Sequence, residues 1–292
     1  MKFPRSLCAL AALAAATLFT LPAKAIDVDA GDYTALPPGT NLLLGYYQHA
    51  TRDKLYANGD KVGINPKLDS DVGILRGVHF TEIGGLIVDP QFLLPFGKLR
   101  AKDDIAALGS NSGLADLILA ATVWFNKADA KEHFGITPFL ILPTGQYDNN
   151  DPLSLGENRW RFILQAGWIK PLTDKLTMDL VADVQFHGKN NDYGALSQER
   201  KQKPQYEFQG FLRYALGAGS DLRFGLQHVT GGENEIDGVD QDDRQSLTKL
   251  QLGASTFISP TQQILATYGR DLSVRNGFKE EHRLNLRFLQ IF

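Results

Sequence analysis

Apolar and polar residues alternate along most of this chain. Residues 159–169 place Trp160, Phe162, Leu164, Ala166 and Trp168 on one parity, and Arg159, Arg161 and Gln165 on the other. Residues 175–188, 205–216 and 221–230 repeat the pattern, and their polar parity holds Asp179, Asp183, His187, Glu207, Arg213 and Arg223. Successive side chains of a strand point to opposite faces. The pattern therefore predicts strands with one apolar face and one charged face.

Twelve such segments are predicted in all. Their ranges are 41–52, 68–80, 86–99, 114–125, 134–146, 159–169, 175–188, 205–216, 221–230, 247–257, 262–270 and 281–292. The first three alternate least regularly, so ten or fourteen strands stay open as alternatives. Proline removes a donor from a strand ladder and marks kinks or bulges. Pro90, Pro95, Pro138 and Pro143 therefore predict irregular strands, with lateral openings in the wall as a second interpretation.

The connections alternate between short and long. The short ones are 81–85, 126–132, 171–174, 217–220 and 258–261, and the long ones are 53–65, 100–113, 147–157, 189–204, 231–246 and 271–279. Transmembrane barrels have short periplasmic turns and longer outer loops. The sequence thus predicts an all-β, single-domain, transmembrane antiparallel up-and-down barrel of twelve strands, with both termini on the periplasmic side. A soluble β-sandwich or lipocalin-like barrel is the alternative.

The cost of burying charge in lipid decides which face points outward. If the strand at 159–169 slipped by one residue, Arg159 and Arg161 would face lipid at roughly 2–4 kcal/mol each near mid-depth. Trp160 and Trp168 share the apolar face eight residues apart, as do Tyr206 and Tyr214. That spacing suits the two aromatic girdles of a membrane barrel.

Both ends of the chain fit export to an outer membrane. Residues 1–25 combine Lys2 and Arg5 with an apolar stretch and an Ala-Lys-Ala site, which predicts a cleaved signal peptide. Residues 26–292 then form the barrel, with 26–40 as a short periplasmic segment or a small plug. The last strand ends on Phe292 and resembles the terminal strand that the barrel assembly machinery of Gram-negative bacteria reads.

Charge and composition narrow the chemistry. The formal net charge is −3, and removing residues 1–25, which hold three basic and no acidic residues, leaves about −6. An acidic chain has no electrostatic reason to bind nucleic acid. Cys8, the single cysteine, lies in the predicted signal peptide, so the mature protein has no disulfide or thiol chemistry. No cofactor or metal is predicted.

Several stretches resemble one family along most of the chain. They are DYTALPPGT (32–40), NPKLDSDVGILR (65–76), DPQFLLPFG (89–97), DLILAATVWF (116–125), PFLILPTGQYD (138–148), LGENRW (155–160), QDDRQ (241–245) and GRDLSVRNGFKE (269–280). Together they resemble the outer-membrane transporters of the phenol meta-degradation (MetA pathway) family. The resemblance implies an outer-membrane barrel that takes up aromatic or other hydrophobic compounds passively, with outer-membrane lipid and a small solute as partners. It implies neither a particular substrate nor a set of functional residues.

The charged face supplies the candidate solute-binding residues. They are Arg159, Arg161, Asp179, Asp183, His187, Glu207, Arg213, Arg223, Arg283 and Arg287, and Asp116 is expected to face inward with them. Twelve strands lie between barrels filled by side chains and barrels that hold a channel. These charges therefore predict either a narrow polar pore that orients a solute or an ion-pair network that fills the interior.

Other chemistry has weaker signals. His187 follows Asp179 and Asp183 on one face and could be a proton relay or a metal ligand, but a polar lumen residue is the plainer interpretation. The six acidic residues between Glu233 and Asp243 lack the spacing of a calcium loop. Residues 109–113 resemble a nucleophile elbow with Asn111 in place of serine. An outer-membrane lipid hydrolase and a structural barrel without transport remain the alternatives to a channel.

Overall fold

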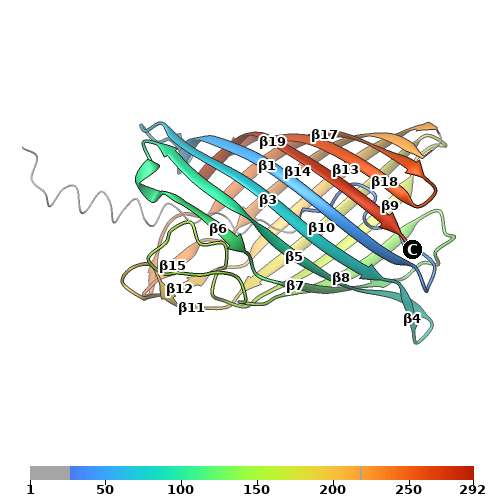
Figure 1. Ribbon diagram of the computed structural model, residues 1–292, viewed down its shortest axis with the longest axis horizontal. Coiled ribbons are helices and arrows are strands. Elements are labelled where there is room, and N and C mark those ends of the chain that lie inside the picture. The colour runs from blue at the N-terminus through green and yellow to red at the C-terminus, as the bar shows by residue number, and fades with distance from the viewer. Residues whose placement is uncertain (1–26, 218) are drawn as a thin grey trace, which may run out of the picture.

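A computed structural model describes residues 27–217 and 219–292 of the chain. Twelve long strands, each antiparallel to the next, form a closed barrel (Figure 1). They are β1 (Asn41–Ala57), β3 (Pro66–His79), β5 (Leu86–Asp103), β7 (Ile118–Trp124), β8 (His133–Ile141), β9 (Arg161–Pro171), β10 (Leu176–His187), β13 (Gln205–Gly217), β14 (Ser220–Gly231), β17 (Gln245–Ser259), β18 (Gln262–Val274) and β19 (Gly277–Ile291). Strand β19 pairs with β1 from Leu42↔Ile291 to Tyr56↔Gly277 and closes the ring.

The predicted up-and-down barrel of twelve strands is confirmed. The three segments with the weakest alternation, β1, β3 and β5, include the two longest strands, of 17 and 18 residues. At the ends of these strands that carry Leu55, Leu68 and Leu99, the inner face is apolar, because these three side chains are buried in one cluster. The alternation of an apolar outer face with a polar inner face therefore does not continue along their whole length. Closure satisfies every strand edge by pairing, which a bilayer demands because it offers no water to backbone groups.

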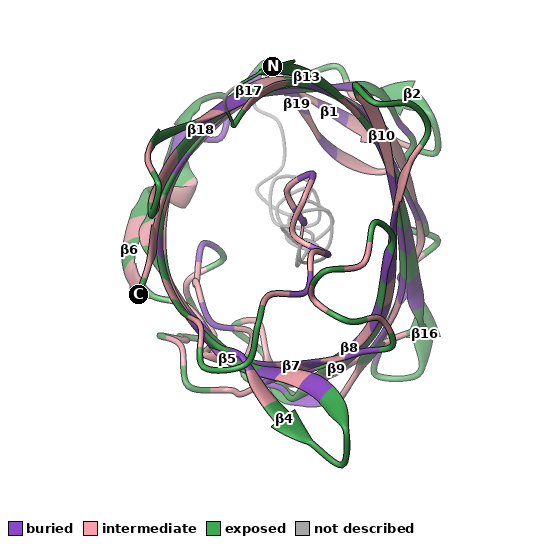
Figure 2. Ribbon diagram, turned by 90° about the vertical axis from the view of Figure 1, so that its right-hand side faces the viewer, coloured by how far each residue is buried: buried purple, intermediate pink, exposed green. Residues whose placement is uncertain are grey.

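The apolar face points outward and the charged face inward, because exposed large hydrophobic residues alternate with buried polar and charged residues along the strands. Figure 2 shows the distribution of buried and exposed positions around the barrel. Trp160 and Phe208 are 55% and 53% exposed, whereas Gln185 and Glu207 are completely buried. A soluble sandwich or lipocalin-like barrel would show the reverse, with the apolar face enclosed. The outward apolar face therefore identifies a membrane barrel.

The connections at the two ends differ, as predicted. The end that carries the C-terminus has short turns, and the opposite end, here called the loop end, has the long connections (Figure 1). Small elements decorate the wall: β2 (Asp60–Lys61), β4 (Thr81–Ile83), a 3₁₀ turn (Ala106–Leu108) and β6 (Ser110–Leu114). Within residues 27–217 and 219–292, no helix is both long and apolar enough to cross a bilayer.

Two connections expected to be loops have their own structure. Residues 189–204 and 231–246 form a four-stranded sheet at the loop end, here called the loop sheet. Its strands are β11 (Asn190–Tyr193), β12 (Gln198–Gln202), β15 (Asn234–Ile236) and β16 (Val239–Asp240). The sequence analysis missed this sheet because its strands have two to five residues and are polar on both faces.

One of the four prolines marks a change of strand partners. At Pro95 the partner of β5 changes from β7, ending at Leu93↔Ile118, to β6, beginning at Phe96↔Leu114. Pro138 lies within β8, as predicted. The prediction for Pro143 was wrong, because β8 ends at Ile141.

Residues 27–40, here called the N-terminal segment, run inside the barrel (Figure 2). Tyr33 packs edge-on against Trp124 with ring centroids 5.8 Å apart, and its hydroxyl donates to Gln165 Oε1 at 3.0 Å. Gly167 of β9 makes room for this ring, since a Cβ there would lie 2.1 Å from Tyr33 Cγ. The predicted signal peptide lies outside the described residues.

We expect Gly167→Val to displace Tyr33 from its seat. The added side chain overlaps the ring, and overpacking of this kind costs roughly 1–3 kcal/mol. Chymotrypsin should then cleave after Tyr33 in the folded barrel, as measured by mass spectrometry. Gly45→Val is the matched control, because nothing lies within 4 Å of a Cβ at that lipid-facing position. Equal protection of Tyr33 in both variants would contradict this account.

Candidate functional site

Arg287 of β19 anchors the N-terminal segment. Its Nη1 lies 3.0 Å from Asp29 Oδ2 and 2.7 Å from Asp32 Oδ1. Asp32 also accepts from Arg76 of β3 at 3.0 Å. Two arginines from neighbouring parts of the wall thus share the acidic side chains of one short segment.

A second anchor holds the start of the segment. Arg283 Nη2 lies 2.6 Å from Asp27 Oδ2, and Gln227 Nε2 donates to Asp27 Oδ1 at 2.5 Å. Arg283 is only 4% exposed, so this pair is shielded from bulk water. Removing one partner from a buried ion pair leaves an uncompensated charge, which is far more costly than losing a surface pair.

Backbone groups of the segment are bound as well. Asp179 Oδ2 accepts from Gly31 N at 2.6 Å, and its carboxylate also pairs with Arg213 Nε at 3.0 Å. Arg223 Nη1 donates to the carbonyl of Ala30. Five of the predicted lumen residues, Asp179, Arg213, Arg223, Arg283 and Arg287, therefore surround the N-terminal segment.

Asp183 and Glu207 form a different group in the middle of the barrel. Neither carboxyl group has an ion-pair partner within 4 Å among the described residues. Gln165 Nε2 donates to Asp183 Oδ2 at 3.0 Å, and Gln227 Nε2 donates to Glu207 Oε1. In this layer, here called the amide belt, the two carboxyl groups are hydrogen-bonded by side-chain amides and not by arginines.

The remaining three predicted residues gather at the loop end around Glu157. Arg159 donates to Glu157 Oε2 through Nε at 2.8 Å and Nη2 at 2.5 Å, and Arg161 Nη1 lies 3.3 Å from Oε1. Burial opposes ionisation of Glu157, but Arg161 and Arg159 outweigh it and hold the pKa of this carboxyl below its ordinary value. Both ring nitrogens of His187 are buried without a hydrogen-bond partner. The group is therefore rich in positive charge.

Two residues of the predicted set lie outside the strands expected to hold them. Arg159 precedes β9, which begins at Arg161, although its side chain is fully buried as expected. Asp116 lies between β6 and β7 and accepts from the backbone N–H groups of Gly145 and Glu157 at 2.9 and 3.0 Å. Asp116 faces inward, where it fastens two connections at the loop end.

The part of the chain that the structure describes contains no candidate metal-binding cluster. No three His, Cys, Asp or Glu side chains there are grouped to hold an ion. Within the acidic run at 233–243, Asp237 accepts from the backbone of Glu199, and Asp243 accepts from the backbone of Asn234. These two carboxylates stabilise the loop sheet.

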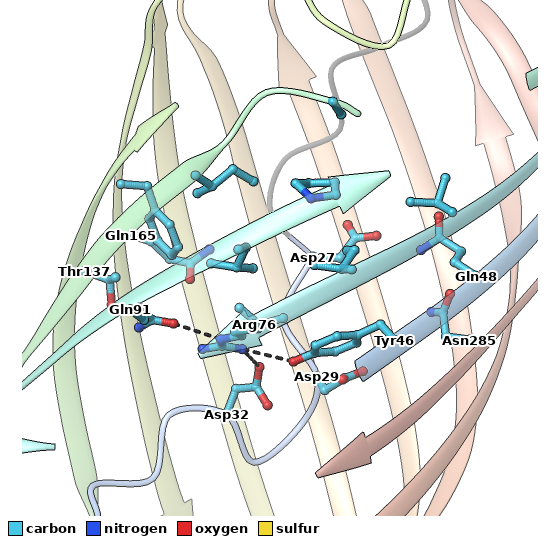
Figure 3. Close-up of a pocket in the computed structure, with 18 of the residues that line it drawn as sticks. Asp27, Asp29, Asp32, Tyr46, Gln48, Arg76, Gln91, Thr137, Gln165 and Asn285 are labelled. Atoms are coloured by element: carbon cyan, nitrogen blue, oxygen red, sulfur yellow. Dashed lines mark hydrogen bonds and ion pairs between the residues drawn. The ribbon is translucent and has the colours of Figure 1, made fainter. Parts of the chain in front are cut away.

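A cavity of about 310 Å³ lies in the barrel interior beside the N-terminal segment (Figure 3). Its wall combines apolar and aromatic side chains with a few polar groups, among them Tyr46, Arg76, Trp124, Phe139 and Gln165. Arg76 donates from Nε to Gln91 at 2.8 Å and from Nη1 to the Tyr46 hydroxyl at 3.2 Å. Such a mixture suits a small, mostly apolar molecule held by few polar contacts.

A second cavity of about 550 Å³ opens toward the end that carries the C-terminus. Asp32 and Arg76 line both this cavity and the interior one. The ion pair between them therefore stands at the boundary of the two spaces. Moving the N-terminal segment would join them.

Sequence reasoning missed Arg76, Tyr46 and Asp32 as site residues. Arg76 and Tyr46 lie in β3 and β1, whose alternation is weak. Asp32 lies in a segment without any period, where only a structure shows what it contacts. The stretch 32–40 that begins at Asp32 supplied part of the family resemblance, which was the one available signal.

Comparisons with solved structures give one close relative and several distant ones. An outer membrane channel from Pseudomonas putida F1 is 45% identical, with a TM-score of 0.88, covering 91% of this chain and 100% of its own. The transport unit of the autotransporter AIDA-I from Escherichia coli has 8% identity and a TM-score of 0.53, covering 95% and 96%. The beta domain of the Bordetella autotransporter BrkA has 11% identity and a TM-score of 0.53, covering 88% and 100%. The two autotransporters share the fold alone.

No curated protein matches the sequence. The barrel and its close similarity to an outer-membrane protein support an outer-membrane location. The profile of one family matches residues 51–288, which is most of the chain, and confirms the resemblance found in the sequence. The chain therefore belongs to the family described as "Putative MetA-pathway of phenol degradation".

Proposed function

We propose that the protein is an outer-membrane channel for passive uptake of small hydrophobic or aromatic compounds. The observation that carries this proposal is the pair of cavities inside the barrel, of about 310 and 550 Å³, which meet at Asp32 and Arg76. A relative at 45% identity is itself an outer membrane channel. The family description supports an aromatic solute.

The lining of the interior cavity favours solutes that are mainly apolar. Ile74, Leu93, Trp124 and Phe139 offer flat or aliphatic surface, while Gln165 and Arg76 offer directed hydrogen bonds. A hydrophilic solute would lose its hydration shell on entering this cavity. The few polar side chains of the wall could replace only part of the lost hydrogen bonds. An aromatic ring gains by leaving water.

Passage requires the N-terminal segment to shift. Its three acidic residues are held by Arg76, Arg283 and Arg287, and these ion pairs are short and buried. Such ion pairs require a specific geometry, but they add little net stability. The free-energy cost of removing both charges from water offsets much of their mutual attraction. The segment is thus well placed to exchange between positions without unfolding the barrel.

The two rival classes have less support. A lipid hydrolase needs a base beside a nucleophilic hydroxyl. In the described residues no hydrogen bond joins a histidine to a serine. His49 and His228 contact threonine hydroxyls, but both histidines lie on the outward-facing parity of β1 and β14, away from the two internal cavities. A purely structural barrel has no need for two internal cavities on either side of one ion pair.

Export and assembly complete the proposal. Residues 1–25 serve as a cleaved signal peptide, and the terminal Phe292 serves as the residue that the assembly machinery reads. Phe292 is 70% exposed beside β1, where its N–H donates to the carbonyl of Asn41 at 2.9 Å. The aromatic ring is therefore available for recognition while the backbone is already paired.

Uptake by whole cells tests the channel. Cells that express the protein should take up radiolabelled toluene several-fold faster than cells with the empty vector. Arg287→Gln should raise this rate and the conductance in planar bilayers, because it removes the contacts to Asp29 and Asp32. Breaking such a buried pair costs roughly 3–5 kcal/mol.

Arg270→Gln is the matched control for that variant. Arg270 is an arginine of the neighbouring strand β18, but its side chain is 45% exposed, shares the outward parity of Tyr268 and pairs with Glu281. Its replacement should leave uptake and conductance unchanged. Toluene uptake no faster than in empty cells would refute the channel.

Assembly can be tested at the last residue. Phe292→Ala should lower the fraction of heat-modifiable, folded barrel in outer-membrane preparations several-fold, because the recognised ring is gone. Phe288→Ala is the control, since Phe288 lies on the same face of β19 and is 43% exposed. Equal yields of the two variants would show that lipid-facing area, and not the terminal ring, controls assembly.

A further inference from the structure

The loop sheet buries an arginine that has no carboxylate partner. Arg200, in the middle of β12, lies between Asn190 of β11 and Ile236 of β15 and is 7% exposed. Its Nε donates to Asn234 Oδ1 at 2.8 Å, and its guanidinium carbon lies 5.0 Å from the centre of the Tyr193 ring. In the described residues, no ion pair within 4 Å involves Arg200.

The lysines of the same sheet behave differently. Lys201 pairs with Glu199 and Glu235, each at 2.9 Å. Lys203 pairs with Glu233 at 2.7 Å and with Asp240 at 3.0 Å. The loop sheet thus provides carboxylates to its exposed cations and none to its buried one.

Arg200 remains charged at neutral pH. Burial, helped by the like charge of Arg159, lowers the pKa of Arg200 to about 10, while Glu157, Tyr193 and Asp243 act in the opposite direction. A buried cation that keeps its charge needs an anion or water to complete its hydrogen bonds. The position is therefore suited to an external anion.

Arg200 lines a cavity of about 570 Å³ between the loop sheet and residues 147–156. Tyr147, Pro152, Tyr193 and Ile236 supply flat or apolar wall. The Tyr147 ring is fixed by its hydroxyl, which donates to the carbonyl of Asp192 at 2.7 Å. The volume lies within the range of small-molecule sites.

Acidic residues also border this cavity, and each of Asp148, Asp151 and Asp237 has at least one oxygen that accepts a hydrogen bond. Asp148 and Asp151 accept from the backbone of Asn150 and Leu153 at 2.9 and 2.8 Å and shape the loop. Asp237 accepts from Gln198 Nε2 and from a backbone N–H of β12, both at 2.9 Å. Their negative charge is spread over hydrogen bonds that hold the cavity wall.

Glu157 borders this cavity too and is neutralised by two arginines. It also lines the interior cavity, so the two spaces meet at this residue. Arg161 Nε and Arg159 Nη1 are buried there without a hydrogen-bond partner. The positive charge that begins at Arg200 therefore continues through Arg159 and Arg161 toward the interior cavity.

We propose that the cavity at Arg200 is an entry site for amphipathic aromatic carboxylates. The ring lies against Tyr147, Tyr193 and Ile236, and the carboxylate accepts from the terminal nitrogens of Arg200. This inference rests on the proposed channel function and adds the chemical class of one group of solutes. It separates them from neutral aromatics, which need only the apolar wall.

Calorimetry on the purified full-length mature protein in detergent tests the site with three probes of similar ring size. Benzoate should bind about tenfold more tightly than benzyl alcohol, since a charge-assisted hydrogen bond adds to the same apolar contact. Benzylammonium should bind most weakly. Arg200→Gln should abolish the preference for benzoate and leave binding of benzyl alcohol unchanged.

Two further variants protect the test against misfolding of the loop sheet. Lys201→Gln, next to Arg200 but ion-paired at the surface, should keep the preference. Val239→Glu adds an anion at a wall position that is 63% exposed, and it should weaken benzoate binding without affecting benzyl alcohol. Benzoate binding that is unchanged in both Arg200→Gln and Val239→Glu would overturn the proposal, as would tighter binding of benzylammonium.

The channel itself is judged separately by toluene uptake, which does not need Arg200. Normal toluene uptake with no preference for benzoate would leave the channel intact and remove the entry site. No toluene uptake would refute the channel, while selective binding of benzoate at Arg200 would still be measured on the purified protein.

Discussion

Neutralisation of charge inside a closed barrel is the constraint on which this structure depends. Lipid outside forces arginines such as Arg76, Arg283 and Arg287 to point inward, and the narrow lumen then holds those charges at low dielectric. The N-terminal segment neutralises three of these arginines. Asp27 pairs with Arg283, Asp29 with Arg287 and Asp32 with Arg76. Its inward fold is therefore an electrostatic consequence of the wall as much as a device of transport.

The same constraint explains how a bound segment can remain movable. An anchor made of apolar contacts would gain steadily from burial, whereas buried ion pairs gain attraction and lose hydration in similar measure. The segment also packs through Val28, Ala30, Tyr33 and Ala35, and Tyr33, the largest of these, lies against Gly167 and Trp124. These small apolar contacts fix the position of the segment, and the ion pairs fix its orientation.

The alternation of single strands revealed most of the barrel, because lipid on one side and polar lumen on the other act on every residue of a spanning strand. Arg283 and Arg287 could be assigned to the inner face from parity alone. Their partners in the N-terminal segment could not, because Asp27, Asp29 and Asp32 belong to a stretch with no period, more than 250 residues away in sequence. The loop sheet was missed for a related reason: Arg200 and Asn190 face neither lipid nor lumen, so no solvent boundary marks their strands. A solute site predicted only from which residues of a strand face the lumen therefore did not include Arg76 and Arg200. It also placed in one group arginines that lie at different levels of the folded barrel.

That separation has a functional meaning along the barrel axis. Glu157 at the loop end meets more arginines than it can neutralise, with Arg159, Arg161 and Arg200 nearby. The amide belt at Asp183 and Glu207 comes next, and the ion-paired N-terminal segment begins there, because Gln227 donates to both Glu207 and Asp27. An anion is thus attracted at the outer mouth, but further inward it meets carboxyl groups bonded to amides and arginines already bound to aspartates. Attraction that continued undiminished into the lumen would trap the solute, and a passive channel must release what it binds. The arrangement of charge therefore favours capture at the outer mouth and weak holding within, which suits a protein that moves its solute only down a gradient.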